Sequence, residues 1–451
     1  MSSFKLTDRK GAEIDIQRLL ENAKSVLNGN WVDGHTKPNP HLYPHQWSWD
    51  SGFIAYGFAH FDQERAQQEL LSLFKGQWGN GLVPQIVFHH DSPLYFPGPD
   101  FWQTDRHPHA GDNPSSSGII QPPIHASATL HIYKHATDKE SATSFLETMY
   151  PKLVMWHDFL YRERDPGNEK LIVLFHPWES GQDNSPLWDE VLEKINPDPT
   201  ELPHYVRKDT DLIDPAERPK KEDYDRYVYL VKLMWELDYD QSNIAEKSPF
   251  VVQDVLTNTL LVRANHDLAE IAEILGIDGS KHESLAEETA KAMNEKLWDG
   301  HHGVYYDYDL VGEKTLHVHH GAGFSPLFAE VPDQDQAKLM IEYLNSRAFC
   351  KLNENCYAVP SYDMQDTKFD PSRYWRGPVW LNVNWILYRG CRLYGFHNYA
   401  EWVRESIIHL PHLYGFCEYY DPHEGKGYGT ENFSWSAALF IDTVLVEFVK
   451  S

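Results

Sequence analysis

Apolar residues recur at helical spacing from one end of the chain to the other, and this periodicity limits the fold more than any other feature. The first apolar stripe runs over residues 16–27 and stops at Gly29. Further helices are predicted over residues 50–60, 65–74, 124–135, 144–161, 224–237, 251–275, 283–297, 321–329, 336–344, 379–394, 399–410 and 436–449. Strand-like segments are few and short, at residues 82–88, 171–175 and 304–308. The sequence therefore predicts an all-α protein.

Long loops rich in aromatic residues separate most of the predicted helices. This alternation is typical of helical hairpins, and six hairpins closed into a ring would form an (α/α)6 barrel whose loops at one end make a cleft. An open helical solenoid is the alternative, but solenoids usually carry repeating consensus residues, which this sequence lacks. The sequence has no linker and no low-complexity tract. We therefore expect residues 1–451 to form a single domain, with long cap loops at about residues 75–120 and 180–225.

The charge balance excludes two classes of partner. The chain carries 67 acidic and 40 basic residues, a formal net charge of −27. Phosphate backbones and anionic membranes require a basic surface, so neither nucleic acids nor membranes are expected partners. Residues 1–10 lack the apolar core of a secretory signal, and no segment approaches the roughly 18 apolar residues of a spanning helix. We expect a cytoplasmic protein, and the sequence leaves its oligomeric state open, a homo-oligomer included.

The cysteines give no sign of a metal site or a disulfide framework. The chain has four of them, Cys350, Cys356, Cys391 and Cys417, without CxxC spacing. Reduced thiols, as in an intracellular protein, are the expectation.

Residues 176–189 (His-Pro-Trp-Glu-Ser-Gly-Gln-Asp-Asn-Ser-Pro-Leu-Trp-Asp) carry the densest set of reactive and aromatic groups. Gly181, Asn184 and Pro186 interrupt a regular helix through this stretch. Carboxylates beside tryptophans are what a sugar site needs, because the flat indole faces pack against the C–H side of the ring while the carboxylates accept from its hydroxyls. The alternative is a structural loop with buried tryptophans and a helix-capping aspartate.

Similar clusters of aromatic and polar residues recur in other loops and at helix starts. They occupy residues 43–50, 95–99, 117–123, 218–227, 374–380, 418–422 and 433–438. Each cluster alone is weak evidence. Their repetition along the whole chain favours a barrel whose mouth is walled by one loop per hairpin.

Glycoside hydrolysis would require two carboxyl groups, one a protonated donor and the other an ionised acceptor. The candidates fall into two groups, Glu179, Asp183 and Asp189 in the first loop and Glu418, Asp421, Glu424 and Glu431 near the C-terminus. Spacing does not choose among them. Their alternative roles are helix capping for Asp183 or Asp189 and a solvated turn for Asp421 and Glu424.

Several motifs resemble glycoside hydrolase family 63. Residues 176–186 are similar to the family's acid-bearing loop, and residues 374–380 match the family too, as does Glu-x-Tyr-Asp-Pro ahead of Phe-Ser-Trp-Ser-Ala-Ala. The resemblance runs from about Tyr43 to Phe440, with the motifs in the same order. It is strongest to the short mannosylglycerate and glucosylglycerate hydrolases, through Tyr-Phe-Pro-Gly-Pro and Arg-Pro-…-Tyr-Asp-Arg-Tyr. This resemblance implies an (α/α)6 barrel that hydrolyses with inversion.

Carried over position by position, the resemblance implies that Asp183 is the general acid and Glu418 the general base, with Glu431 as an alternative base. The residues implied for the sugar subsite are Trp47, Trp49, Asp50, Gln121, Trp178, Trp375 and Trp380. Those implied to bind glycerate are Tyr95, Arg218, Tyr224 and Tyr374, and Tyr43 is a further substrate-binding residue. A guanidinium suits a glycerate carboxylate, although Arg218 could instead pair with Glu222.

Two positions depart from the family pattern. Gln182 stands where we expect Met, beside the acid, and Phe433 stands where the glucosylglycerate enzymes resemble one another in having Gln. The second departure favours mannosylglycerate. The expected protein is thus an inverting α-glycosidase of compatible-solute breakdown. It would hydrolyse 2-O-α-mannosylglycerate, or glucosylglycerate, to hexose and glycerate, with neither a metal nor a cofactor.

Three other functions stay open. An α-glucosidase acting on a neutral glucoside or disaccharide, such as glucosylglycerol, would leave Arg218 without a purpose. A sugar epimerase or isomerase on the same barrel would use histidines as proton carriers, and the chain has 25 of them. A non-catalytic sugar-binding protein would not need Asp183 and Glu418 together.

Overall fold

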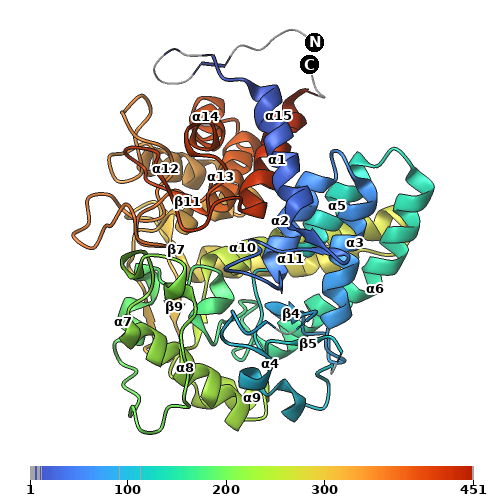
Figure 1. Cartoon of the computed structure of the whole chain (residues 1–451), viewed down its shortest axis with the longest axis vertical. Coiled ribbons are helices and arrows are strands. Elements are labelled where there is room, and N and C mark those ends of the chain that lie inside the picture. The colour runs from blue at the N-terminus through green and yellow to red at the C-terminus, as the bar shows by residue number, and fades with distance from the viewer. Residues whose placement is uncertain (1–5, 8–10, 12, 91, 112, 449–451) are drawn as a thin grey trace.

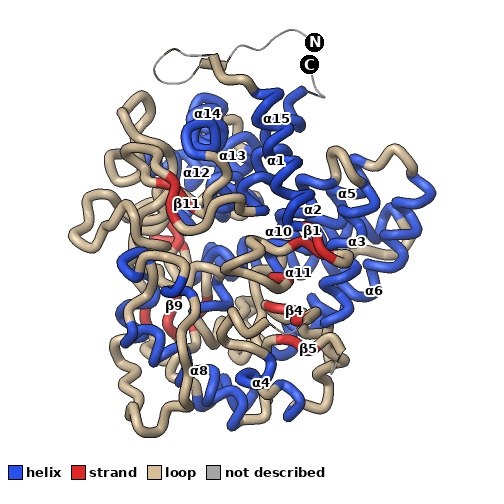
Figure 2. The backbone as a smooth tube through the Cα atoms, viewed as in Figure 1, coloured by secondary structure: helices blue, strands red, loops and turns tan. Residues whose placement is uncertain are grey.

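The computed structural model of the chain describes residues 6–7, 11, 13–90, 92–111 and 113–448 (Figures 1 and 2). Its α-helices are α1 Ile16–Asn30, α2 Ser48–Phe58, α3 Gln63–Leu73, α4 Pro99–Trp102, α5 His125–His135, α6 Lys139–Glu163, α7 Asp189–Leu192, α8 Lys221–Glu236, α9 Gln241–Lys247, α10 Val255–Ile274, α11 Ser280–Lys296, α12 Gln334–Leu344, α13 Leu381–Leu393, α14 His397–Tyr414 and α15 Ser434–Phe448. Most of residues 1–10, where no secretory signal is expected, and Val449, the predicted end of the last helix, lie outside the described residues.

Short 3₁₀ turns and strands complete the element order. The 3₁₀ segments are η1 Phe74–Gly76, η2 Thr104–Arg106, η3 Pro177–Ser180, η4 Pro186–Trp188, η5 Asp209–Asp211, η6 Pro215–Glu217 and η7 Gly321–Ala329. The strands are β1 Trp31–Val32, β2 His35–Thr36, β3 Gln46–Trp47, β4 Ile86–Phe88, β5 Ser115–Ser116, β6 Val252–Gln253, β7 Trp298–Asp299, β8 Val304–Tyr305, β9 Tyr308–Asp309, β10 Lys314–Thr315, β11 Tyr419–Tyr420 and β12 Gly427–Tyr428.

Within the described residues, six elements pack side by side into a closed inner ring. Around the ring the order is α2, α5, α10, η7, α13 and α15, and α15 packs back against α2. The outer helices α1, α3, α6, α11, α12 and α14 alternate with the inner elements along the chain and pack on the outside of the ring (Figure 1). This arrangement confirms the predicted (α/α)6 barrel and excludes an open solenoid.

Burial explains which helices lie inside. All eleven residues of α2 are buried, as a helix that is apolar on every side requires. The outer helix α1 instead buries one stripe, and Asp15 caps it by accepting a hydrogen bond from the Arg18 backbone N–H. Gly57 permits the close approach of α2 to α15, because a Cβ there would lie 2.6 Å from the Cα of Ala438.

The predicted helix at residues 321–329 is η7, a 3₁₀ segment instead of an α-helix. Pro326 lies inside it, lacks a backbone N–H and would clash with the preceding turn of an α-helix. All nine residues of η7 are buried, so the segment still fills its place in the ring. Pro326 is therefore the physical reason why this segment is a 3₁₀ helix instead of the predicted α-helix.

The strands form five small antiparallel sheets among the described residues. The three-stranded sheet β3-β4-β5 pairs Trp47 with Ile86 and Val87 with Ser116, so it ties the start of α2 to the loop before α5. The predicted strand at residues 82–88 contains β4. Only one bridge, from Leu174 to Val252, forms in the predicted strand at residues 171–175. The predicted strand at 304–308 divides between β8 and the start of β9.

Between ring helices the chain makes two long excursions, residues 74–124 and residues 164–254. The first contains β4, α4 and β5, and the second contains α7, α8 and α9. Most of these elements lie in the lower half of the view in Figure 1, away from α1 and α15. Helix α8 matches a predicted helix, whereas the short helix α9 was not predicted.

The cysteine prediction is wrong for one pair. Cys350 and Cys356 form a disulfide, with their Cα atoms 5.8 Å apart, while Cys391 and Cys417 are buried free thiols. The turn between the paired cysteines brings their Cα atoms within bridging distance, which sequence spacing does not reveal.

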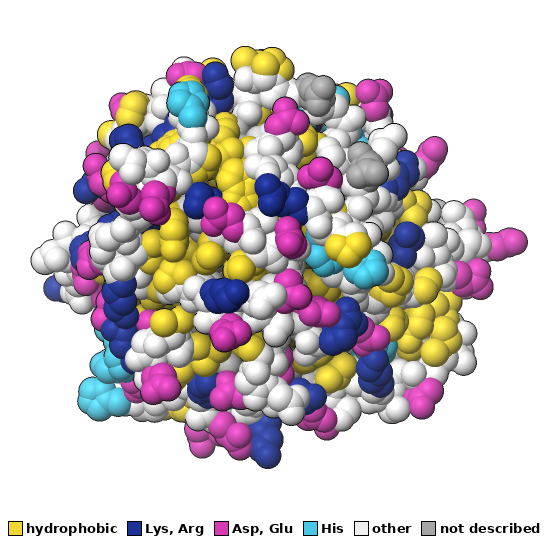
Figure 3. Space-filling model, turned by 90° about the horizontal axis from the view of Figure 1, so that it is seen from below, with side chains coloured by type: hydrophobic (Ala, Val, Ile, Leu, Met, Phe, Trp, Pro, Cys, Tyr) yellow, Lys and Arg dark blue, Asp and Glu magenta, His cyan; other side chains and the backbone are white. Residues whose placement is uncertain are grey.

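Two surface observations bear on partners. Across the described chain, no helix combines the length and the apolar character that crossing a membrane requires. On the face seen in Figure 3, acidic and basic side chains are interspersed instead of gathering into a basic stripe.

Candidate active site

The candidate active site is a pocket at the end of the barrel where the inner elements begin. Trp47, Trp49 and Asp50 lie at the start of α2, Gln121 lies shortly before α5, and Trp380 directly precedes α13. Helix N-termini present unpaired N–H groups and a partial positive charge. This end of the barrel therefore favours anionic groups and hydrogen-bond acceptors.

All fourteen predicted site residues line this one pocket. They are Tyr43, Trp47, Trp49, Asp50, Tyr95, Gln121, Trp178, Asp183, Arg218, Tyr224, Tyr374, Trp375, Trp380 and Glu418. Their common location says nothing by itself about the role of each. Among the lining residues that were not predicted are Gln85, Phe96, Lys208, Asp209, Phe433 and Trp435. Of these, Phe96, Phe433 and Trp435 lie within recognised motifs, but Lys208 and Asp209 lie in a cap loop without a sequence signal.

Glu179 anchors the loop that follows the segment 171–175. Its carboxylate is fully buried and pairs in bidentate fashion with Arg164, at 2.7 and 2.9 Å. It also accepts the backbone N–H groups of Phe175, at 2.6 Å, and Ile120, at 3.1 Å. Four donors therefore occupy Glu179, which makes it a structural residue and removes it as a candidate acid.

Asp189 is also committed to an ion pair. Arg376 donates to its two oxygens at 2.9 and 2.7 Å, and Lys368 donates at 3.0 Å. These cations hold the pKa of Asp189 below its usual range despite its burial. Of the three acidic candidates in this loop, only Asp183 lines the pocket.

The backbone positions Asp183 at the pocket wall. Gly181 has a φ of 70°, and a Cβ there would lie 2.3 Å from the Trp49 ring, so the turn before Asp183 requires glycine. The Tyr227 hydroxyl donates to the Asp183 carbonyl at 2.7 Å. Burial raises the pKa of Asp183 to about 7, the Arg218 charge opposes this rise, and nearby Glu418 adds to it. A substantial fraction of Asp183 is therefore protonated near neutrality.

Glu418 has a different environment. Tyr43 donates to its Oε1 at 2.7 Å, and the Thr430 backbone N–H donates to its Oε2 at 3.2 Å. Arg218 Nη1 lies 3.9 Å from Oε1. Burial raises the pKa of Glu418, but the Arg218 charge and both hydrogen bonds act in the opposite direction by stabilising the carboxylate.

The other acidic residues near Glu418 lie outside the pocket lining. Asp421 accepts the backbone N–H groups of His423 and Glu424, so both belong to a turn; Glu424 is exposed, as the solvated-turn alternative predicted, whereas Asp421 is buried. Glu431 is exposed and borders a different surface depression. Its position favours Glu418 over Glu431 as the acidic group that acts in the pocket.

Aromatic side chains form the walls of the pocket. Trp375 and Trp380 stack with their ring centroids 3.9 Å apart and their planes 4° from parallel. Trp47 makes an edge contact with Tyr95 at 5.2 Å. The Gln121 amide oxygen accepts the Trp49 backbone N–H at 3.1 Å, which fixes α2 against the loop before α5. Flat indole faces beside acceptor groups suit a sugar ring.

Asp50 lies in the first turn of α2 and is buried. Burial raises the pKa of this carboxyl well above its usual range; its own backbone N–H opposes the rise, whereas the charge of Glu418 adds to it. Asp50 is thus a third acidic group of the pocket, and in its neutral form it both donates and accepts hydrogen bonds.

Arg218 is a buried cation of the pocket. Its Nε donates to Asp209 at 3.2 Å, its Nη1 donates to the Tyr43 hydroxyl at 3.2 Å, and its guanidinium lies over the Tyr374 ring at 4.3 Å. The alternative pairing with Glu222 is wrong, because the carboxylates within ion-pair distance of Arg218 are those of Asp209 and Glu418. Arg218 is buried and faces the pocket, where it can meet an anionic group.

Comparison with known proteins gives the family. A family model described as "Mannosylglycerate hydrolase MGH1-like glycoside hydrolase domain" matches residues 43–436. The chain belongs to this glycoside hydrolase family. It is 47% identical over 430 residues to a mannosylglycerate hydrolase of Rubrobacter radiotolerans, covering 95% of this chain and 97% of that protein. It is 35% identical to a glucosylglycerate hydrolase of Mycolicibacterium hassiacum, over 94% of this chain and 97% of that protein.

A solved structure extends the similarity to three dimensions. The crystal structure of the GH63 mannosylglycerate hydrolase from Thermus thermophilus in complex with Tris and D-glycerate superposes with a TM-score of 0.88 at 44% identity. The superposition covers 94% of this chain and all of that one. The predicted resemblance to glycoside hydrolase family 63 is confirmed, and the protein is a glycoside hydrolase.

The structural role of Glu179 gives a stability prediction. Glu179→Gln leaves the buried Arg164 guanidinium without a counter-charge, so the free energy of unfolding should fall by about 3–5 kcal/mol. Glu163→Gln is the matched control, because Glu163 pairs with the exposed Arg162 and should contribute less than about 1 kcal/mol. Urea unfolding of both variants measures the difference. Equal, small decreases in the free energy of unfolding of both variants would show that the buried Arg164–Glu179 pair does not anchor the loop.

Proposed function

We propose that this protein is an inverting α-glycosidase that hydrolyses 2-O-α-mannosylglycerate to mannose and D-glycerate. The observation that carries the proposal is the cluster of Arg218, Tyr43 and Glu418 opening onto the pocket that Asp183 also lines. A guanidinium with hydroxyl donors suits the carboxylate of a glycerate aglycone. Mannosylglycerate hydrolases at 47% and 44% identity support the same substrate.

In the proposed mechanism Asp183 is the general acid. Its carboxyl group would donate a proton to the glycosidic oxygen as the bond to the anomeric carbon breaks, so that glycerate leaves as a neutral alcohol at that oxygen. This role needs a carboxyl group that is protonated near neutrality. Burial supplies that property by raising the pKa of Asp183 to about 7.

Glu418 is the proposed general base. It would accept a proton from a water molecule that attacks the anomeric carbon on the face opposite the leaving group. The hydrogen bonds from Tyr43 and Thr430, together with the Arg218 charge, favour its ionised form. Burial raises the pKa of both carboxyl groups, to about 7 for Asp183, but for Glu418 two hydrogen bonds oppose the rise together with the Arg218 charge, and this difference in environment supports the assignment of acid and base.

The remaining predicted residues divide between two subsites in this proposal. The sugar would pack against the tryptophans of the pocket, with Asp50 and Gln121 meeting its hydroxyls. The glycerate would meet Arg218, with hydroxyls from Tyr43, Tyr95, Tyr224 and Tyr374 around it. All of these residues come from one chain. A homo-oligomer is compatible with this site, and we place the enzyme in the cytoplasm.

Glucosylglycerate is the second candidate substrate. The relative that hydrolyses it is 35% identical, against 47% for the mannosylglycerate hydrolase, and Phe433 lines the pocket at the position that favours mannosylglycerate. A neutral aglycone would leave the buried Arg218 facing the pocket without an anionic partner in the ligand. An epimerase is disfavoured because no histidine lines the pocket within the described part of the chain.

The catalytic pair gives the first test. Asp183→Asn and Glu418→Gln should each lower kcat by at least about 10²–10⁴-fold, because each removes one proton-transfer group. Glu431→Gln is the control and should keep near wild-type turnover, since Glu431 lies outside the pocket. Release of free hexose from mannosylglycerate measures all three variants. An active Glu418→Gln beside an inactive Glu431→Gln would contradict the assignment of the base.

Arg218 gives a test of the aglycone. Arg218→Ala should lower kcat/KM for mannosylglycerate about ten- to a hundredfold more than for an aryl mannoside that lacks the carboxylate. Some loss on both substrates is expected, because Arg218 also stabilises ionised Glu418. Arg226→Ala is the matched control, because Arg226 donates to Asp223 and to the Ile195 carbonyl and lies outside the pocket lining. Any decrease in kcat/KM that this control variant shows should be equal for mannosylglycerate and for the aryl mannoside. An equal loss in Arg218→Ala would mean that Arg218 does not bind glycerate.

The stereochemistry tests the mechanism itself. If Asp183 and Glu418 act across the sugar with water between them, their carboxyl groups should be about 6.5–9.5 Å apart, and the first sugar released should be the β-anomer. Proton NMR of the anomeric signal in the first minutes, before mutarotation, measures the product. An initial α-sugar would indicate retention and a covalent intermediate, which is incompatible with a water-activating Glu418.

A further inference from the structure

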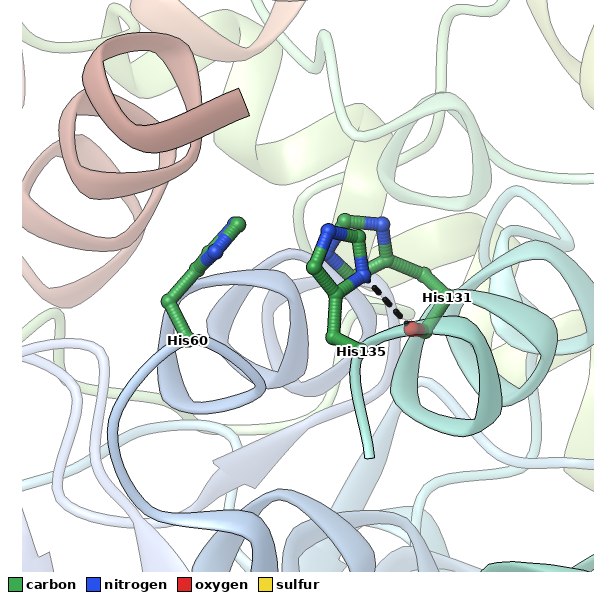
Figure 4. A group of neighbouring side chains, drawn as sticks. All are labelled: His60, His131 and His135. Carbon is green, nitrogen blue, oxygen red and sulfur yellow. Dashed lines mark hydrogen bonds between the residues drawn. The ribbon is translucent and has the colours of Figure 1, made fainter. Parts of the chain in front are cut away.

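Three histidines gather at the other end of the barrel, where inner helices end. His60 follows the last turn of α2, and His131 and His135 lie four residues apart near the end of α5. Figure 4 shows the three imidazole rings facing a common space between these two helices. The centroids of the His131 and His135 rings are 4.0 Å apart, and His60 lies 5.4 Å from the first and 4.6 Å from the second.

A carboxylate from a third ring helix completes the group. Asp442 of α15 places its Oδ1 2.8 Å from His60 Nε2 and 3.2 Å from His131 Nε2. His131 is buried, and its Nε2 makes no hydrogen bond despite this proximity. Tetrahedral ligands at about 2.0–2.2 Å from a metal lie roughly 3.4 Å from one another. The two distances from Asp442 Oδ1 are close to that value, and one ring nitrogen from each of the three histidines lies within 4.8 Å of the others.

The neighbours of these side chains orient them as metal ligands are usually oriented. His135 Nδ1 hydrogen-bonds the His131 backbone carbonyl at 2.9 Å, which leaves Nε2 as its available nitrogen. The second oxygen of Asp442 accepts from Trp385 Nε1 at 2.7 Å and from Arg389 at 3.2 Å. Asp442 Oδ1 therefore faces the histidines, while Arg389 donates to the other carboxylate oxygen.

We propose that His60, His131, His135 and Asp442 bind a first-row transition-metal dication of the Zn²⁺ type. Three imidazole nitrogens and one carboxylate oxygen form a donor set that zinc accepts in tetrahedral geometry, whereas Mg²⁺ and Ca²⁺ prefer oxygen ligands. The C-terminal ends of α2 and α5 add partial negative charge around a bound cation.

The site is accessible and joins three ring helices. A cavity of about 450 Å³ opens onto His131 and Asp442. A metal there would link α2, α5 and α15, which are consecutive neighbours in the ring. It would lie at the opposite end of α2 from Trp49 and Asp50, about 15 Å along an eleven-residue helix. The metal would therefore stabilise the barrel and take no part in hydrolysis, and this proposal is independent of the proposed substrate.

A second group of potential ligands provides the matched control. Asp299, His301 and His302 also lie close together, but both histidines are exposed, and Asp299 already accepts hydrogen bonds from their backbone N–H groups. Such a surface group binds added metal weakly. His301→Ala/His302→Ala removes it and leaves the buried group intact.

Calorimetric titration of the chelator-treated, full-length protein with Zn²⁺ tests the proposal. The wild type and the His301→Ala/His302→Ala variant should each bind one Zn²⁺ with micromolar or tighter affinity, and Zn²⁺ but not Mg²⁺ should raise their Tm. His135→Ala and His60→Gln should bind at least about tenfold more weakly and lose the rise in Tm. Circular dichroism and metal-free hydrolysis rates, both unchanged, show that these two variants are folded.

Co²⁺ gives a spectroscopic readout of the same site. The wild type should develop the visible absorption of tetrahedral Co²⁺, and His135→Ala should not. The proposal is overturned if the wild type binds no Zn²⁺ under these conditions. It is equally overturned if tight binding survives in both His135→Ala and His60→Gln but disappears in the His301→Ala/His302→Ala variant.

Discussion

The buried ion pair between Arg164 and Glu179 determines the geometry of the pocket. A charged pair removed from water is stable only when its remaining hydrogen-bonding capacity is satisfied, and here the backbone N–H groups of Phe175 and Ile120 provide that satisfaction. These partners come from the end of α6, the segment before the acid-bearing loop and the loop before α5. The pair therefore fixes the position of Asp183 relative to Gln121, although neither side chain contacts it.

The two ends of the ring carry different functional groups, because inner helices begin at one end and finish at the other. At one end the inner elements begin, and the loops there supply aromatic walls, several carboxyl groups and the Arg218 guanidinium. At the other end α2 and α5 finish, and the groups that gather there are imidazoles and a carboxylate. The partial positive charge at the helix N-termini faces the carboxyl groups of the pocket, and the C-terminal ends of α2 and α5 face the imidazoles.

Local patterns predicted the helices, and the resemblance to a known family predicted which residues line the pocket. Periodicity reports how one segment buries its own face, which is why the ring helices could be located from the sequence. It does not report the 3₁₀ geometry of η7, which depends on Pro326 and on packing from both sides. The resemblance placed Asp183 and Glu418 in one pocket, whereas spacing alone left seven acidic candidates.

The sequence did not reveal which side chains pair with each other in the folded chain. Asp209 pairs with Arg218, although Glu222 seemed equally suitable at the start of α8, because the folded cap loop brings Asp209 and not Glu222 to the guanidinium. Ion pairs also remove Glu179 and Asp189 from the candidate acids. Arg164 pairs with Glu179, and Arg376 pairs with Asp189 from a loop far along the chain, and local sequence patterns do not reveal either pairing. The disulfide between Cys350 and Cys356 depends on the path of one turn.

The last helix of the chain closes the ring against the first two: α15 packs on both α1 and α2. During synthesis, α2 is complete long before α15, one of its principal neighbours, has been made. Until then the nascent barrel is an open arc. At that stage Trp49 does not yet have its edge contact with Trp435, and Glu418 is synthesised only shortly before α15. The ring therefore cannot close, and the pocket cannot be complete, before α15 has been synthesised, and until then α2 lacks one of the helices that bury it.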